Sequence, residues 1–483
     1  MLYRKKGFIV LAVFIFILFF TNFITYRLSI GDADNEGKDS LSGSGDGEES
    51  VESSYSEEYN LLFTVVDILN REYLEEFDRE ELIEGAVIGL LKKLNDPQTS
   101  YLDTDAMDNL LISLKGSFGG IGVRIIDSEE GVIVIEVLPD TPAEEANLQP
   151  GDRICAVDGT DVRDYTVEEA VAIIRGEKGS TVTLGIERPG IEDIIEADLV
   201  RADIQSNTVK GEMIKPGIGY IKISNFDGTT GDDFLEKFGS MEDEGLDGFI
   251  LDLRDNPGGV LHEVLKVARE LVPEGEIVRI VDRNGAIREI YHSYAREKEY
   301  PIAVLINGGS ASGSEIIAGA LQDHGTAVLV GSPSFGKATV QHFETFENGS
   351  GLRYTVAKYV TPSGNDIHGE GIKPDVDVEL PQYHRYFYYL GPGALEKGDF
   401  GQPVFLLQSM LEALGYNVEP IGYFDDLTES AISRFQQRFD LESHGRFDDI
   451  TWVYLRQELD EIIHEEDDQL LEALRLIEER LAD

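Results

Sequence analysis

Residues 301–322, PIAVLINGGSASGSEIIAGALQ, contain the strand-to-helix junction around which the fold of this 483-residue chain is organised. The apolar run 302–306 predicts a strand covered on both faces, and the segment 307–315 leads directly into a helix. Similar apolar runs predict further strands at 219–223, 249–253 and 327–330. Because strands alternate with helices here, we expect an α/β core, to which the run 352–360 adds a half-exposed antiparallel strand.

The composition limits the partners of the protein. Acidic residues outnumber basic ones by 92 to 41, which gives a formal net charge of −51. Such a surface repels phosphate backbones and argues against nucleic acid as a partner. The single cysteine, Cys155, excludes an internal disulfide and a zinc site made of cysteines.

The N-terminal segment predicts export and membrane anchoring. Basic residues at 4–6 precede an uncharged run, 8–26, which is long enough to cross a hydrocarbon layer of about 30 Å. The basic flank predicts a cytoplasmic segment 1–7 and a body outside the membrane, in a bacterial envelope. No small-residue cleavage pattern follows, which favours an uncleaved single-pass anchor over a signal peptide. The Gly-, Ser- and acid-rich segment 27–56 is expected to be a solvated tether.

Residues 57–112 carry two helical patterns whose apolar faces need a partner. These faces comprise Leu62, Val65, Val66, Leu69 and Tyr73 in the first helix and Ile83, Val87, Leu90, Leu91 and Leu94 in the second. They could pack on the body of the protein or on a second copy, and the sequence leaves both open.

Residues 113–202 predict a β-rich module. Short strands are expected at 123–126, 132–137, 153–157 and 181–187. One helix interrupts them, with Thr166 and Glu169 as a capping box and Gly176 at its end.

This module resembles a PDZ domain. The string Gly119, Gly120, Ile121, Gly122 resembles the loop that binds a terminal carboxylate, and the string LQPGD at 148–152 resembles the turn that follows it. The resemblance implies capture of protein tails as an added strand. The structural alternative is that these glycines only form tight turns.

Ser312 lies at the junction between the predicted strand and helix, near backbone N–H groups that have no helical partner. Ser312 and Glu315 also fit a capping box, which is a purely structural role. The residues alone do not choose between a nucleophile and a cap.

Three strings in order resemble the C-terminal processing peptidases, or tail-specific proteases: LDLRDNPGG at 251–259, NGGSASGSE at 307–315 and FGKATVQ at 335–341. The resemblance covers residues 57–382. It implies a crotonase/ClpP-like protease core at 203–390 with an inserted-type PDZ domain, and a homodimer. No cofactor is expected.

The same resemblance assigns roles by position. It implies Ser312 as nucleophile, Lys337 as general base and Gln341 as the residue that orients the lysine, because the intervals from serine to lysine and from lysine to glutamine match those of the family. The backbone N–H groups of Gly258 and Gly313 are implied as oxyanion donors. The family usually has alanine at position 313 and often glycine where Ala338 stands, and we expect both differences to be tolerated.

The residue chemistry is consistent with these roles. A lysine accepts a proton only when it is uncharged, so its pKa must fall from about 10.4 to about 7–8. Glycines let backbone donors approach the oxyanion, at about 3–4 kcal/mol per donor. Arg175 closes the predicted helix of the PDZ-like module. The family implies that it senses the bound tail, whereas a cation at a helix C-terminus is the structural alternative.

Other functions were weighed. A histidine base such as His368 is disfavoured because Ser312 lacks the glycine two positions earlier that a nucleophile elbow requires. No metal-binding motif is present in the sequence. A non-catalytic PDZ scaffold and a crotonase-like acyl-CoA enzyme remain rivals.

Residues 397–459 resemble a three-helix peptidoglycan-binding domain, and a plain packing module is the alternative. The acidic helix 460–483 is expected to contact another subunit. The sequence therefore predicts an exported, membrane-anchored serine endopeptidase with a multidomain α/β fold, which binds protein tails through its PDZ domain and cleaves near them.

Overall fold

The computed structural model describes residues 52–128, 131–205, 207–380, 390–391, 393–465 and 467–482. These residues form two compact units, one containing Leu110–Ala338 and the described residues from Tyr359 onward, the other containing residues 52–109 and 339–358. The predicted membrane span at 8–26 lies outside the described residues. Within the described ranges, no helix has both the length and the apolar character needed to cross a bilayer.

A six-stranded sheet forms the centre of the larger unit, and its four central strands are the apolar runs predicted above. The strand order is β10-β11-β12-β15-β16-β19, with β10 antiparallel to β11 and the other neighbours parallel. The bounds are β10 (Val209–Lys215), β11 (Ile218–Ile223), β12 (Gly248–Asp252), β15 (Ile302–Ile306), β16 (Ala327–Gly331) and β19 (Val376–Asp377). A hairpin of β13 (Gly275–Val281) and β14 (Ile287–Ser293) is inserted between α8 and β15.

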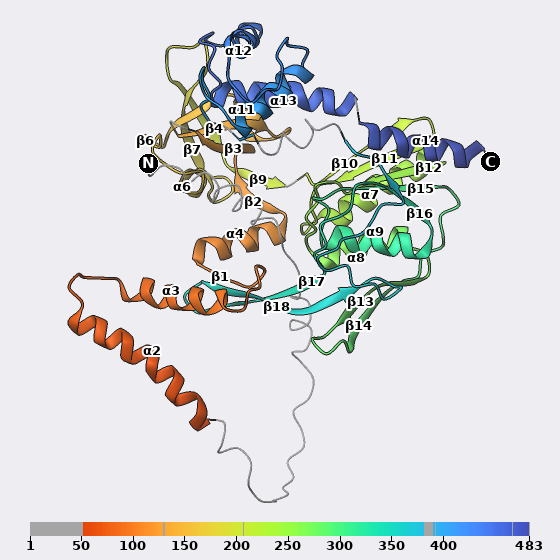
Figure 1. The fold of residues 1–483 in the computed structure, drawn as a ribbon, viewed down its shortest axis with the longest axis horizontal. Coiled ribbons are helices and arrows are strands. Elements are labelled where there is room, and N and C mark those ends of the chain that lie inside the picture. Colours follow the sequence, from red (N-terminus) through yellow and green to blue (C-terminus); the bar gives the residue numbers. More distant parts are fainter. Residues whose placement is uncertain are drawn as a thin grey trace, which may run out of the picture. The chain divides into compact units, whose positions relative to one another are not determined.

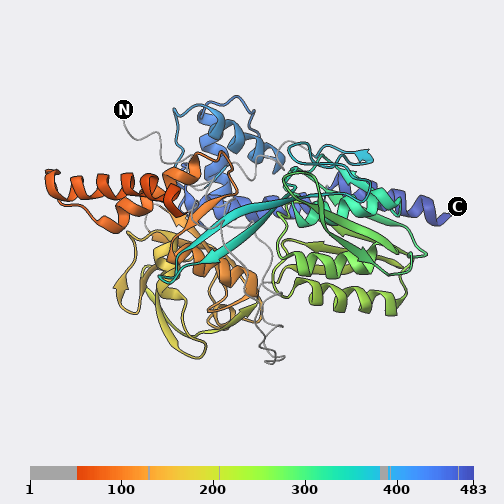
Figure 2. The same cartoon turned by 90° about the horizontal axis from the view of Figure 1, so that it is seen from below.

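Helices cover both faces of this sheet. Three helices connect neighbouring parallel strands: α7 (Thr230–Gly245), α8 (Leu261–Leu271) and α9 (Gly313–His324). Each connection moves one strand further along the sheet in the same direction, so right-handed crossovers place the three helices on one face of the sheet. Phe249 of β12 points to that face and contacts Phe238 of α7. Its neighbour Ile250 points to the other face, where α14 (Asp468–Ala482) lies (Figure 1; Figure 2).

Helix α14 packs on its own chain, so the expected contact with another subunit is wrong for its buried face. Ala473, Leu474 and Ile477 are buried against β11, β12, β15 and β16. A Cβ atom on Gly248 would lie 2.5 Å from Ile477 Cγ2, which shows how closely helix and sheet approach. The apolar stripe alone indicated that the helix needs a partner but not which one. Leu481 remains exposed.

We expect Ile477→Ala to destabilise the larger unit by about 3 kcal/mol, because it removes a fully buried side chain between helix and sheet. The matched control Leu481→Ala, on the exposed side of the same helix, should change the free energy of unfolding by less than about 0.5 kcal/mol. Denaturant unfolding of the full-length chain, followed by circular dichroism, measures both. Equal effects of the two substitutions would contradict the packing described.

The PDZ-like module is a sheet of order β3-β4-β5-β7-β8, with β6 paired to β5. The bounds are β3 (Val123–Ser128), β4 (Gly131–Val137), β5 (Arg153–Val157), β6 (Thr160–Asp161), β7 (Thr181–Glu187) and β8 (Ile195–Val200), with helices α5 (Pro142–Glu145) and α6 (Val167–Ile174). A separate pair, β2 (Ser117–Gly120) and β9 (Ala202–Gln205), flanks it in sequence. The predicted capping box is confirmed: Glu169 N donates to Thr166 Oγ1, and Thr166 N donates to Glu169.

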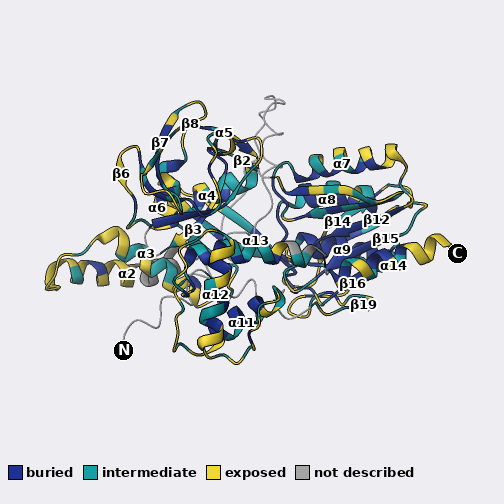
Figure 3. Cartoon of the chain, turned by 90° about the horizontal axis from the view of Figure 1, so that it is seen from above, coloured by how far each residue is buried: buried dark blue, intermediate teal, exposed yellow. Residues whose placement is uncertain are grey.

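The smaller unit contains helices α2 (Glu52–Glu72) and α3 (Arg79–Lys92), strand β1 (Ser100–Leu102), the start of α4 (Thr104–Lys115), and an antiparallel ladder in which β18 (Gly351–Val360) pairs with both β1 and β17 (Thr339–Thr345). Helix α2 begins at Glu52, inside the segment expected to be a tether. Much of α2 is exposed (Figure 3), including Leu62 and Val65 of its predicted apolar face, and Tyr73, which follows the helix, is exposed as well.

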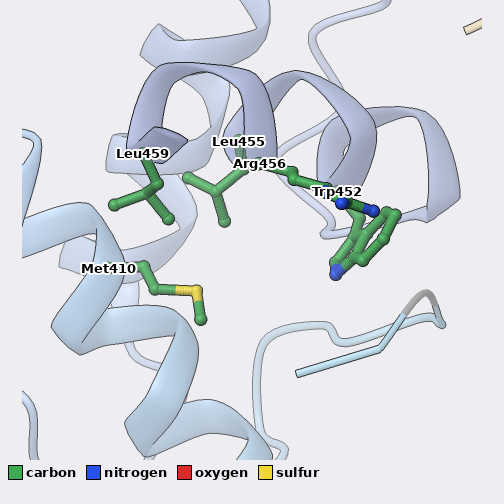
Figure 4. Close-up of a pocket in the computed structure, with 5 residues that line it drawn as sticks. All are labelled: Met410, Trp452, Leu455, Arg456 and Leu459. Atoms are coloured by element: carbon green, nitrogen blue, oxygen red, sulfur yellow. The ribbon is translucent and has the colours of Figure 1, made fainter. Parts of the chain in front are cut away.

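The C-terminal module is a bundle of α11 (Gln402–Ala413), α12 (Asp426–Arg438) and α13 (Asp449–Glu465) around Phe424, Phe435 and Phe447, as the three-helix prediction requires. A small surface hollow lies between α11 and α13 (Figure 4). Its lining consists of Met410, Trp452, Leu455, Arg456 and Leu459.

Candidate active site

Ser312, the predicted nucleophile, occupies a strained position at the junction of β15 and α9. Its φ is 53° and its ψ is −110°, a conformation that non-glycine residues rarely adopt. Ser312 is partly exposed, whereas Ser310 and Ser314 are fully buried. Strain at an exposed serine between a strand and a helix is the arrangement that presents a hydroxyl for reaction.

The two neighbouring serines hold the loop that follows β12. Ser310 Oγ donates to Leu253 O at 2.8 Å, and Ser314 Oγ donates to Asn256 O at 2.9 Å. Asn256 O also accepts the N–H of Ala311 at 2.9 Å. These bonds fasten the loop 253–259 to the segment that carries Ser312.

The same loop brings the two predicted oxyanion residues together. A Cβ atom on Gly258 would lie 2.7 Å from Gly313 N and 2.8 Å from Ser312 Cβ, so only glycine fits there, at a φ of 98°. The N–H of Gly258 donates to Asn256 Oδ1 at 2.8 Å in this conformation. Gly313 is equally confined, because an added Cβ would lie 2.4 Å from Val264 Cγ2.

One buried carboxylate connects Ser312 to Lys337. Glu315 Oε2 accepts the backbone N–H of Ser312 at 2.8 Å and that of Lys337 at 2.9 Å. Its other oxygen, Oε1, accepts Ser334 Oγ and Gly336 N, both at 2.6 Å. Burial raises the pKa of Glu315, and the donated hydrogen bonds oppose that rise.

One buried hydroxyl makes a second connection between the same two residues. Tyr359 Oη lies 2.6 Å from Lys337 O and 3.0 Å from Ser312 O, so its proton is shared between the two carbonyl oxygens. Burial and the nearby Glu315 raise the pKa of Tyr359, which keeps the hydroxyl protonated as a donor. Glu315 and Tyr359 therefore fix both the N–H and the C=O groups of Ser312 and Lys337.

The structure brings together Ser312, Gly313, Gly258 and the backbone of Lys337. The Lys337 residue is only 3% exposed. Gln341 belongs to the smaller unit, where it is buried on β17 and its Nε2 donates to Thr339 Oγ1 at 2.8 Å. The orienting role of Gln341 stays a prediction.

From the sequence, Glu315 was expected only as a partner in a helix cap, and Tyr359 was not identified. The capping-box spacing from Ser312 to Glu315 was a signal for the role of Glu315, because it places the carboxylate beside Ser312 N. No local pattern identifies Tyr359, which reaches the site from β18, 47 residues after Ser312. His368, the histidine weighed above, is exposed.

In the PDZ-like module, Gly119 and Gly120 lie on β2 and pair with Asp203 and Ala202 of β9. Ile121 is buried and its carbonyl accepts the N–H of Ala143, while Gly122 has a φ of 86°. Of the predicted carboxylate loop, the first two residues therefore belong to the end of β2, and the last two form the turn to β3.

Arg201 caps the carbonyls at the end of α6, with Nε donating to Ile174 O at 2.7 Å and Nη2 donating to Ile173 O at 2.9 Å. The Arg175 guanidinium lies 4.5 Å from the ring centroid of Phe118, the residue before the predicted loop. Burial lowers the pKa of Arg175. The sequence analysis missed Arg201 because its partners are 27 and 28 residues away.

Comparison with known proteins places this architecture in a family. Family models match peptidase family S41 at residues 217–378, a PDZ domain at 110–187, a peptidoglycan-binding domain at 400–455 and the N-terminal domain of the activating protease CtpB at 22–106. The carboxy-terminal processing protease CtpA of Bacillus subtilis is 32% identical over 424 residues, covering 88% of this chain and 91% of the relative. CtpB of the same organism is 34% identical over 403 residues, covering 82% and 83%.

The chain therefore belongs to peptidase family S41, the C-terminal processing serine proteases that carry a PDZ domain. Among solved structures, the photosystem II D1 C-terminal processing protease is 30% identical with a TM-score of 0.42, over 67% of this chain and 93% of that one.

We expect Tyr359→Phe to lower kcat for peptide hydrolysis by about tenfold while KM changes by less than about twofold, because the carbonyls of Ser312 and Lys337 lose their common donor. Stability should fall by only about 1 kcal/mol. Tyr354→Phe, a partly exposed tyrosine on the same strand, is the matched control. Steady-state kinetics of both variants test this expectation. An unchanged kcat in Tyr359→Phe would contradict a role of the Tyr359 hydroxyl in holding Ser312 and Lys337 together.

We expect Gly313→Ala to destabilise the protein by about 1–3 kcal/mol and to lower kcat, because its Cβ collides with Val264 Cγ2. The double variant Gly313→Ala with Val264→Ala should recover most of both losses. A double-mutant cycle of unfolding free energies measures the coupling, and purely additive effects would show that the two sites are independent.

Proposed function

We propose that this protein is an exported, membrane-anchored serine endopeptidase that binds the C-terminal tail of other envelope proteins through its PDZ domain and cleaves near that tail. Ser312 is the nucleophile, Lys337 the general base and Gln341 the residue that orients the base. The observation that carries the proposal is the double connection of Ser312 to Lys337 through Glu315 and Tyr359.

The reaction needs a neutral amine beside the serine. Lys337 takes the proton of the Ser312 hydroxyl while Oγ attacks the scissile carbonyl carbon and forms a tetrahedral intermediate. Collapse of the intermediate breaks the C–N bond, and the leaving amine takes the proton from Lys337. Water then hydrolyses the acyl-enzyme. The near-complete burial of Lys337 supports this role, because burial disfavours a charged amine.

The developing oxyanion would be held by the backbone N–H groups of Gly313 and Gly258, which lie next to each other. The N–H of Gly258 donates to Asn256 Oδ1, so the substrate oxygen has to replace that acceptor. Glycine at position 258 supports this assignment, because a side chain there would fill the space beside Ser312 Cβ.

Tail capture is assigned to the PDZ loop at Gly119, Gly120, Ile121 and Gly122. An incoming tail would add a strand to the module and place its carboxylate at the loop. Arg175 is the candidate sensor of the bound tail. Its position over the ring of Phe118 supports this.

The remaining partners complete the proposal. The run 8–26 would anchor the body to the cell membrane, and the C-terminal module would bind peptidoglycan. The exposed apolar side chains of α2 and α3, among them Leu62, Val65 and Leu90, support a homodimer formed through these helices.

We expect Ser312→Ala and Lys337→Ala each to lower kcat for cleavage of a protein tail by about 10,000-fold or more while tail affinity is retained. The measurement is mass spectrometry of products from peptides that end in a free carboxylate or in an amide, with Kd for the same peptides. A catalytically inert PDZ scaffold predicts no cleavage by the wild-type protein. The tail-binding role predicts weaker binding and slower cleavage of the amide peptide.

A further inference from the structure

A buried charge cluster joins the last helix of the chain to the loop beside Ser312. Arg254 donates to Asp252 through Nε at 2.9 Å and Nη2 at 2.6 Å. The same guanidinium donates to Asp467 through Nη1 at 2.8 Å and Nη2 at 2.7 Å. All three side chains are less than 10% exposed. Two carboxylates thus hold the two edges of one guanidinium, the strongest geometry that such a group can make.

Asp467 has a second role at the start of α14. Its Oδ1 accepts the N–H of Leu470 at 2.9 Å, which is the bond of a helix N-cap. Gln469 is the second residue of α14. Its Oε1 lies 3.2 Å from Arg254 Nη1, and its Nε2 donates to Val378 O at 2.8 Å. The first turn of α14 is therefore bound to Arg254 and to the segment that follows β19.

Arg254 stands at the beginning of the loop that ends at Gly258. Its backbone N–H donates to Asp252 Oδ1 at 2.9 Å, so the side chain and the backbone of this residue share one partner. Asp255, which follows, has a φ of 58°. Only three residues lie between Arg254 and Gly258, the glycine whose added Cβ would lie 2.8 Å from Ser312 Cβ. A displacement of the guanidinium would therefore move the loop against Ser312.

We propose that Asp467 is a positioning residue for the active site: through Arg254 it holds the loop 254–259 beside Ser312, so that the segment C-terminal to the helical module completes the catalytic core. The inference rests on the proposed endopeptidase function. The apolar face of α14 secures the helix on the sheet, and the ion pair transmits that position to the loop.

Two substitutions separate this role from simple stability. Asp467→Asn keeps one oxygen that can accept the N-cap hydrogen bond. It replaces the other oxygen by an NH2 group, which cannot accept a hydrogen bond from Arg254 Nη1 or Nη2. Asp467→Ala removes both functions. The matched control is Glu478→Gln, which breaks the exposed ion pair of the same helix with Lys215.

We expect Asp467→Asn, in the full-length chain, to lower kcat for tail cleavage by about 10- to 100-fold, with KM and tail Kd changed by less than about twofold and Tm lowered less than in Asp467→Ala. Asp467→Ala should lose as much kcat and show the larger fall in Tm. Glu478→Gln should match the wild type. A wild-type kcat in Asp467→Asn would overturn the proposal, and so would a loss of kcat that only follows the fraction of unfolded protein.

Hydrogen–deuterium exchange provides a test that does not depend on activity. In Asp467→Asn, amides of the loop 254–259 should exchange faster than in Glu478→Gln, whereas those of α6 in the PDZ-like module should not change. Unchanged exchange in the loop would overturn the inference even if the wild-type protein cleaves. If the wild-type protein does not cleave but the loop responds, the proposed enzyme function fails and the structural coupling stands.

Discussion

The buried carboxylate of Glu315 is the group on which the arrangement of the site depends. Its two oxygens accept four donated hydrogen bonds, two of them from the backbones of Ser312 and Lys337. Those residues come from different strand-to-loop junctions, and neither β15 nor β16 alone would set their separation. Burying an unpaired carboxylate is costly, so the folded state requires every one of those donors to be in place. The same requirement keeps the backbone of Ser312 in its strained conformation.

Much of this architecture follows from local sequence. The alternation and apolar runs predicted β5, β7 and β15 with the bounds found in the structure, and Thr166 with Glu169 predicted the start of α6. The secondary structure of these elements is determined by residues within a few positions in the sequence. The family resemblance supplied the roles of Ser312 and Lys337, which stay predictions, while the geometry adds how their backbones are held together.

What the sequence did not predict depends on contacts between distant residues. An amphipathic pattern indicated that α14 needs a partner, but the identity of that partner is a property of the assembled sheet. Arg201 and Tyr359 are single polar residues within strand-like patterns. Their roles depend on contacts formed only in the folded chain, between Arg201 and the end of α6 and between Tyr359 and Ser312. The effect of having glycine at position 313, where the family usually has alanine, likewise depends on the contact of this position with Val264 in the folded chain.

Helix α14 follows in sequence all the strands on which it packs, which affects the order in which the protein can be assembled. A polypeptide is made from its N-terminus, and domains generally begin to fold as they emerge. The sheet of the core is available long before residues 467–482, yet one of its faces stays uncovered until those residues are released. A nascent chain that has not yet released residues 467–482 therefore carries Ser312 before Arg254 can contact Asp467.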